Sequence, residues 1–444
     1  MLTQIELENF KSYRSGTLQL ARLTVLIGAN ASGKSNLIDA LRLLTKLASG
    51  ERLSSLSIAH QRDESVLRGG VENLGYRGAK TFGFFCETST LFPSWQPPAS
   101  YWPYFSIELS LGKDGDLRVT KEQIAGFTST VPLYKITSPP QGAGSDVFVA
   151  YNNFARGGKK PEIVCSSHMA IFTQLLSEIR FRQQNEESRK TIPKVAQSYV
   201  RWLSSIVFLE PEPSAMRSYG HKADKILKEH GENLSGVLYN LCCDEAIKAI
   251  VLEFVQSLPE QDIKDISFIE TPRGEVMLQL TETFGGTETQ YDAAMLSDGT
   301  LRVLSIAAAL LSAPEQSLVV IEEIDNGVHP SRAADLLARI SRIAKNRNLR
   351  ILLSSHNPAL LDALPDDAVP HTVFCYRSPK NGSSQLIRLQ DIPDYPELIA
   401  QGSVGHLMTQ GILDRFVKQH PGPERKKQKA MEWLASLRAE GESA

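Results

Sequence analysis

Hydrophobic and polar residues alternate at the start of the chain, and farther along the hydrophobic residues gather in short runs. Residues 5–10 alternate isoleucine, leucine and phenylalanine with glutamate and asparagine, which predicts a strand with one buried face. Residues 23–27 are hydrophobic at almost every position, so we expect a strand buried on both faces within a parallel sheet. In residues 35–47 leucine and isoleucine recur at helical spacing, which predicts an amphipathic helix.

The region from residue 69 to residue 122 shows the alternation typical of an antiparallel sheet. We expect strands at 82–86, 104–111 and 117–121. Residues 125–160 are rich in glycine, proline, serine and threonine, and we expect a loop or loosely ordered insertion there.

Helical patterns begin again beyond this insertion. Residues 168–207 are charged and helical in pattern, with an interruption expected at Pro193. From residue 231 onward short apolar strands alternate with helices, which predicts right-handed crossovers and a sheet buried on both faces. Helices are expected at 246–257, 300–312 and 331–344, and strands at 266–270, 276–283, 318–321 and 349–353. The tail from residue 421 is expected to be a basic surface helix.

These patterns together predict an α/β fold with a mostly parallel sheet, an antiparallel β subdomain and a helical insertion. A length of 444 residues is enough for one large core or for two or three smaller ones. We divide the chain into an N-terminal lobe, a loop and helical insertion, a C-terminal lobe and a helical tail, at residues 1–125, 126–205, 206–395 and 396–444.

Composition narrows the classes of function. The formal net charge of −2 argues against a uniformly basic surface for nucleic acid, although a local basic patch stays open. No signal peptide is recognisable and no apolar run is long enough to span a bilayer, so we expect a cytoplasmic protein without membrane contact. The five cysteines form no C-x-x-C pair, which argues against a zinc site or a disulfide framework.

A glycine-rich turn links the apolar strand at 23–27 to the helix at 35–47. Its sequence matches G-x-x-x-x-G-K-[ST], in which the glycines let backbone N–H groups turn inward around a phosphate. We expect Lys34 to reach the outer phosphates and the Ser35 hydroxyl to ligate Mg²⁺. The residues predicted to bind nucleotide here are Gly28, Asn30, Ala31, Ser32, Gly33, Lys34 and Ser35.

Two carboxylates end the apolar strand at 318–321. A buried parallel strand delivers its last residues to the carboxyl edge of the sheet, where α/β proteins bind their ligands. We assign Glu322 to the metal and Glu323 to the attacking water as a general base.

Two further segments carry candidate phosphate-binding groups. Residues 296–302 form a polar turn that opens an apolar helix, so Ser297 and Gly299 are predicted to contact phosphate oxygens at a helix N-terminus. His356 follows the strand at 349–353 and is expected to hydrogen-bond the γ-phosphate or the attacking water.

The four segments, in this order, resemble the ABC ATPase superfamily. They are similar to its Walker A, signature, Walker B and switch-histidine elements, at Gly28–Ser35, 296–302, 318–323 and His356. Within the superfamily the chain resembles the RecF/OLD/SMC-like branch, often described as AAA-type ATP-binding proteins of bacterial defence systems. The resemblance is carried by the first strand at 5–13, by the E-E-x-x-x-G-x-H-P string at 322–330, and by residues 403–407 with Gly411.

The resemblance implies ATP and Mg²⁺ as cofactors and a homodimer that closes around ATP. In such a dimer the Walker A and Walker B residues of one copy face Ser297 and Gly299 of the other, and Asp325 lies near the opposite site. The chain departs from the family pattern where Glu322 replaces the usual aspartate and where only Gln61 is a candidate Q-loop residue. We expect no TOPRIM nuclease domain, because Asp391 and Asp394 lie in a proline-rich turn without a partner glutamate.

Three functions remain open. The first is a regulatory or sensor ATPase in an antiviral defence complex, with a separately encoded effector that could be a nuclease. The second is a RecF-like ATPase that clamps DNA, and DNA or RNA stays open as a partner. The third is the nucleotide-binding subunit of a transporter, which the string after the two glutamates fits poorly.

Overall fold

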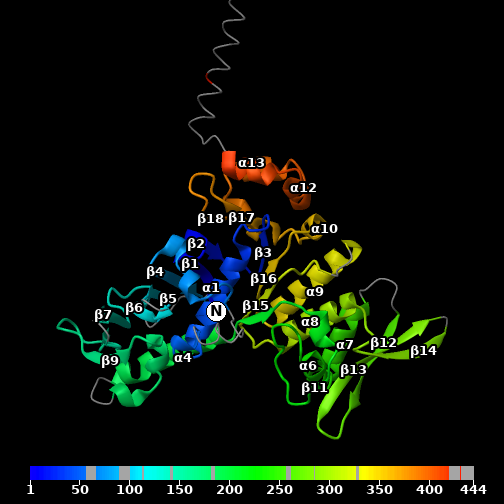
Figure 1. Ribbon diagram of the computed structural model, residues 1–444, viewed down its shortest axis with the longest axis horizontal. Helices are drawn as coiled ribbons and strands as arrows, with labels where there is room; N and C mark the ends of the chain where they lie inside the picture. The colour runs from blue at the N-terminus through cyan, green and yellow to red at the C-terminus, as the bar shows by residue number, and fades with distance from the viewer. Residues whose placement is uncertain are drawn as a thin grey trace, which may run out of the picture.

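The structure is a computed structural model. It describes residues 1–56, 67–89, 101–112, 115–140, 144–181, 186–256, 262–284, 286–326, 330–419 and 431. Over these residues the strands form three sheets, and Figure 1 shows the largest on one side of a central sheet and the smallest on the other.

The central sheet is the parallel sheet that the sequence predicts. Its strands, in spatial order, are β10 (Val207–Leu209), β15 (Leu318–Ile321), β16 (Arg350–Ser354), β3 (Leu23–Ile27), β17 (Val373–Arg377) and β18 (Ser384–Arg388). All neighbouring pairs are parallel except β17 and β18, which pair antiparallel. The strands predicted at 23–27, 318–321 and 349–353 are therefore confirmed.

Successive residues of β15 explain why its sequence is apolar throughout. Leu318 and Val320 belong to a core shared with α1 and the antiparallel sheet, whereas Val319 and Ile321 belong to the core on the other face. The helices that cover these faces are α1 (Lys34–Ala48) on the first, and α8 (Asp298–Ser312) and α9 (Ala333–Asn346) on the second. A strand buried on both faces has no position for a polar side chain.

The second sheet has eight antiparallel strands. They are β2 (Tyr13–Gln19), β1 (Leu2–Phe10), β4 (Thr81–Thr88), β5 (Tyr104–Leu111), β6 (Leu117–Ala125), β7 (Tyr134–Ser138), β8 (Asp146–Tyr151) and β9 (Glu162–Ser166), in spatial order. The loop predicted at 125–160 is wrong, because β7 and β8 lie within it. Buried and exposed residues alternate only briefly in these strands, as in β8, where Val147 and Val149 are buried and Phe148 is exposed. Glycine and proline in the connections make the segment as a whole resemble a loop. The sheet also crosses the proposed boundary at 125, and the division into four parts stays a prediction.

The helical insertion packs against this antiparallel sheet. It comprises α3 (Ile171–Gln174), the 3₁₀ turn η4 (Glu178–Phe181) and α4 (Glu186–Ser204). The interruption predicted at Pro193 is wrong, because α4 continues through this residue. Pro193 lies on the buried face together with Ile192 and Ala196, and packing of that face outweighs the single backbone hydrogen bond that proline removes.

The third sheet corrects the prediction of right-handed crossovers for two strands in the second half of the chain. The strands predicted at 266–270 and 276–283 are β12 (Ile263–Glu270) and β13 (Glu275–Phe284), which pair antiparallel outside the central sheet. Two further strands, β11 (Gly220–His221) and β14 (Thr287–Asp292), also pair with β13. β14 has no apolar face, so its sequence carries no signal of a strand.

Short helices complete the structure. α6 (Leu234–Leu241) and α7 (Glu245–Gln256) pack against the third sheet, and α5 (Pro213–Met216) packs against α8 (Figure 1). Along the chain α10 (Pro358–Asp362) lies between β16 and β17, and α11 (Tyr395–Ile399), α12 (Val404–Thr409) and α13 (Ile412–Gln419) follow β18. The remaining 3₁₀ turns are η1 (Val71–Asn73), η2 (Tyr76–Gly78), η5 (Pro330–Arg332), η6 (Val369–His371) and η7 (Leu389–Asp391). The predicted basic tail lies outside the described residues, apart from Met431. No helix in the described part is long and apolar enough to cross a membrane.

The position of α1 between two sheets gives a test of the fold. Leu44 is fully buried in the core that α1 shares with both sheets, so Leu44→Ala should remove about 2–5 kcal/mol from the free energy of unfolding. The partly exposed Lys46 on the same helix is the matched control, and Lys46→Ala should change stability little. Urea unfolding followed by circular dichroism measures both, and equal midpoints for the two variants would contradict the packing described.

Candidate functional site

The glycine-rich turn lies between β3 and α1, as predicted, and its glycines are required by close contacts. Gly28 has φ of 142° and Gly33 has φ of 120°, values that other residues rarely adopt. A Cβ atom on Gly28 would lie 2.2 Å from the carbonyl oxygen of Cys375, and one on Gly33 would lie 2.4 Å from Ser384 Oγ. The neighbouring β17 and β18 therefore leave no space for a side chain at either position.

Two side chains that sequence reasoning did not assign to the site brace this turn from outside. The Tyr13 hydroxyl donates to the carbonyl oxygen of Gly33 at 3.1 Å, and Arg377 Nε donates to the carbonyl oxygen of Ala31 at 2.9 Å. Tyr13 begins β2 and Arg377 ends β17. The loop conformation is thus fixed by both the antiparallel and the central sheet.

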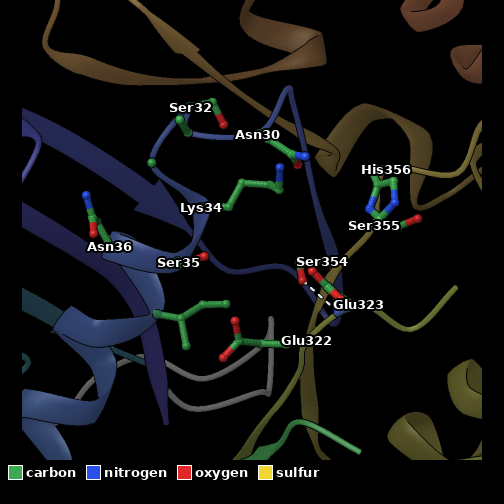
Figure 2. Close-up of a pocket in the computed structure, with 13 residues that line it drawn as sticks. Asn30, Ser32, Lys34, Ser35, Asn36, Glu322, Glu323, Ser354, Ser355 and His356 are labelled. Atoms are coloured by element: carbon green, nitrogen blue, oxygen red, sulfur yellow. Dashed lines mark hydrogen bonds between the residues drawn. The ribbon is translucent and has the colours of Figure 1, made fainter. Parts of the chain in front are cut away.

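Lys34 closes over the turn (Figure 2). Its Nζ donates to the carbonyl oxygens of Gly28 at 2.6 Å and Ala29 at 3.2 Å. Burial lowers the pKa of the Lys34 ammonium below its ordinary value, and the carboxylates of Glu323 and Asp325 oppose that shift. The cation is therefore held beside a loop whose backbone geometry and helix N-terminus both favour phosphate.

A pocket of about 140 Å³ joins this turn to the ends of two neighbouring strands. Residues 30–36 line one side, Glu322 and Glu323 follow β15, and Ser354 to His356 lie at the end of β16 (Figure 2). The structure thus brings together the phosphate-binding turn, both glutamates and the histidine, although the turn precedes the other three residues by more than 280 positions in the sequence.

Glu322 occupies the buried end of the pocket. Its Oε1 accepts from Arg42 at 2.6 Å and its Oε2 accepts from Arg68 at 3.3 Å. Burial raises the pKa of the Glu322 carboxyl above its ordinary value, and the two arginines act in the opposite direction. Glu322 and Ser35 both line the pocket, and a carboxylate with a hydroxyl is a donor set that suits Mg²⁺.

Glu323 is exposed and its backbone is in the left-handed region, with φ of 48°. The backbone N–H of Glu323 donates a hydrogen bond to the Ser354 hydroxyl at 3.0 Å, and Figure 2 draws this contact. Asn326 Nδ2 donates to Glu323 Oε2 at 2.7 Å. An exposed carboxylate on a constrained backbone is suited to accept a proton from water.

His356 lies opposite Lys34 across the pocket mouth (Figure 2). Its side chain is half exposed, and its Nδ1 lies 3.6 Å from Asp325 Oδ2. Asp325 is buried, and its Oδ1 has no hydrogen-bond partner within the described structure. The carboxylate therefore lies beside the imidazole, and one of its oxygens is unused.

Ser297 and Gly299 do not line the pocket of their own chain. Ser297 is the N-cap of α8, where its Oγ accepts from the backbone N–H of Thr300 at 3.1 Å. The turn is exposed, and the side chain of Met295 beside it is 68% exposed. A single chain therefore leaves this predicted phosphate-binding turn open to solvent.

Sequence reasoning missed a group of charged residues behind Glu322. Arg42, Arg68, Glu210 and Glu229 come from four separate segments, and all four lie near its carboxylate. The only signal was Arg42, a charge within the apolar pattern of the helix at 35–47. Gln61 and residues 327–329 of the string after Walker B lie outside the described residues.

Comparisons with known proteins agree with this geometry. Residues 1–69 match the family described as "AAA ATPase domain", and residues 177–362 match "AAA domain, putative AbiEii toxin, Type IV TA system". A segment of 78 residues is 36% identical to the DNA replication and repair protein RecF of Acidothermus cellulolyticus, and it spans 17% of this chain and 21% of that protein. The two family matches support an ATPase, and the similarity to RecF is confined to this one segment.

Solved SMC heads are also similar over most of the chain. The SmcHead bound to the C-winged helix domain of ScpA covers 87% of this chain and 97% of its own, at 15% identity and a TM-score of 0.47. The SMC head domain from Thermotoga maritima covers 87% and 98%, at 13% identity and a TM-score of 0.41. Because both TM-scores are below 0.5, the α/β assignment rests on the strand order of this chain itself.

The contact beneath Gly28 gives a test of the phosphate-binding turn. Gly28→Ala should abolish nucleotide binding, because its methyl group would strike the Cys375 carbonyl. Gly157→Ala is the matched control, since Gly157 also has a positive φ but has no atom within 4 Å of the added carbon. Fluorescence titration with an ATP analogue measures both, and normal binding by Gly28→Ala would contradict the turn as described.

Proposed function

We propose that this chain binds and hydrolyses ATP with Mg²⁺ at the pocket between β3, β15 and β16. The observation that carries the proposal is the convergence of the glycine-rich turn with Glu322, Glu323 and His356. The glycine-rich turn binds the phosphates, and Glu322, Glu323 and His356 each have a separate task in phosphoryl transfer to water.

The residues divide the chemistry between them. Backbone N–H groups of 28–35 and the Lys34 ammonium bind the phosphates, while Ser35 and Glu322 hold the metal. Magnesium supplies charge neutralisation of the phosphate oxygens. Glu323 accepts a proton from the attacking water, and His356, which lies beside Asp325, hydrogen-bonds the γ-phosphate or that water.

A second copy of the chain completes the site in this proposal. Ser297 and Gly299 lie on an exposed turn at the N-terminus of a helix, and this is the geometry that binds anionic oxygens. Closure of two copies would place the turn of each against the ATP of the other. Hydrolysis is then slow in one copy alone and is gated by dimerisation.

The biological role we propose is a regulatory or sensor ATPase in an antiviral defence complex, with the effector on a separate chain. The match of residues 177–362 to a family named for a putative AbiEii toxin supports a role of this class. The alternative, a RecF-like ATPase that clamps DNA, is supported equally by the 78-residue similarity to RecF. The two roles differ in the expected partner, which is a protein effector in the first and DNA in the second.

Two substitutions test the catalytic assignment. Lys34→Ala should weaken ATP binding by about tenfold to a hundredfold, the usual loss when a hydrogen bond to a charged group is removed. Glu323→Gln should bind ATP normally, fail to hydrolyse it, and accumulate as a dimer that light scattering detects after size exclusion. A Glu323→Gln protein that stays monomeric in saturating ATP and Mg²⁺ would count against the shared site.

The partner distinguishes the two biological roles. Tagged Glu323→Gln, purified from the native host with ATP and Mg²⁺, should retain one protein from a neighbouring gene, and Lys34→Ala should lose it. Recovery of DNA together with repair proteins would instead support the RecF-like role. In that case binding to DNA should fall steeply as the salt concentration rises.

A further inference from the structure

Both carboxylate oxygens of Glu322 are held by arginines, but the two arginines differ in their surroundings. Arg42 contacts Oε1 and its side chain is 4% exposed, whereas Arg68 contacts Oε2 and its side chain is 48% exposed. One oxygen therefore has a buried, fixed partner and the other a partner at the surface.

Arg42 is fixed by further ion pairs. It donates from Nη1 to Asp39 Oδ1 at 3.2 Å and from Nε to Glu229 Oε1 at 3.0 Å. Asp39 is also paired with Lys11. A buried arginine with three carboxylate partners keeps its position, because moving it away would leave its own desolvated charge unpaired.

Arg68 is placed between two acceptors of nearly equal distance. Its Nη2 lies 3.3 Å from Glu322 Oε2 and 3.4 Å from Glu210 Oε2, and Glu210 is itself 47% exposed. The backbone carbonyl of Arg68 accepts from Lys11 Nζ at 2.8 Å. The backbone is therefore anchored while the guanidinium can exchange one carboxylate for the other.

We propose that Arg68 competes with Mg²⁺ for Glu322 Oε2, and that Glu210 retains the guanidinium when the metal takes its place. The inference rests on the proposed function, since it assigns Glu322 to the metal. A guanidinium hydrogen-bonded to Oε2 would repel a divalent cation brought to the same carboxylate, so the two compete for it. Arg68 is thus a positioning residue that sets how much magnesium the site requires.

Movement of the Arg68 guanidinium from Glu322 to Glu210 would connect metal binding with a neighbouring pocket on the surface. Arg68, Arg77 and Tyr76 line a second pocket, of about 750 Å³, which shares Asn36 with the phosphate-binding pocket. When magnesium binds, the contact that ties residues 67–78 to the end of β15 is released. The guanidinium then faces this second pocket and Glu210, while the Arg68 backbone stays held by Lys11.

The test measures the magnesium concentration that gives half-maximal binding of a fluorescent ATP analogue. Arg68→Gln should lower this concentration about twofold to fivefold, the range expected when a half-exposed ion pair no longer competes. Arg77→Gln is the matched control, because Arg77 donates to the Asn381 carbonyl and has no contact with Glu322 in the described structure. It should leave the midpoint unchanged, and Arg68→Lys, which keeps the charge, should shift it less than Arg68→Gln.

A double-mutant cycle tests the part assigned to Glu210. Glu210→Gln should raise the magnesium midpoint in the wild type and raise it less in the Arg68→Gln background, because Glu210 lies 3.4 Å from Arg68 and 3.7 Å from Arg42. Equal midpoints for Arg68→Gln, Arg77→Gln and the wild type would overturn the inference while nucleotide binding persists. Failure of the folded wild type to bind the analogue at any magnesium concentration would instead overturn the proposed function.

Discussion

Parallel pairing of three strands is the constraint on which the rest of the site depends. β16 pairs with β3 on one side and with β15 on the other, and all three run in the same direction. Their carboxyl ends therefore meet at one edge of the sheet, where each strand is followed by polar residues. The phosphate-binding turn, the two glutamates and His356 reach one pocket only because this register holds, and the glycine-rich turn itself is pressed against β17.

Charged side chains are concentrated beneath this edge of the central sheet, whereas a core with only a structural role seldom contains buried charges. Glu322, Arg42 and Asp39 are all buried, and Arg42 donates a hydrogen bond to each of the two carboxylates. Buried ion pairs contribute little net stability, because desolvation offsets most of their attraction, so they are better explained by the site they orient. In this protein they fix one oxygen of Glu322 and leave the other facing a surface arginine.

The sequence was informative wherever a residue's role depends on its near neighbours. The apolar runs of β3 and β15, the helical repeat of α1 and the glycine-rich turn all predict their structures correctly, since each is a local pattern. Prediction from the sequence failed where contacts between distant segments decide the local structure. β7 and β8 are short strands stabilised by pairing along a sheet that begins at β2, and the helix through Pro193 is maintained by packing against that sheet.

The charged cluster could not be predicted for the same reason. Arg68, Glu210 and Glu322 are separated by more than 100 residues in sequence, and nothing near each of them indicates that they share contacts. Arg42 alone carried a signal, as a charge in an apolar helical pattern. The helix start predicted at Ser297 is confirmed, since this residue is the N-cap of α8, and its contact with phosphate stays a prediction.

We propose that each ATP site is completed by a second copy of the chain. The experiment that tests this proposal mixes two inactive variants, Lys34→Ala and Ser297→Arg, and measures ATP hydrolysis. If the site is shared, the mixed dimer contains one intact site, and the mixture should recover about a quarter of the wild-type rate. If each chain carries a complete site of its own, no combination of the two variants will restore hydrolysis, and the shared-site account is contradicted.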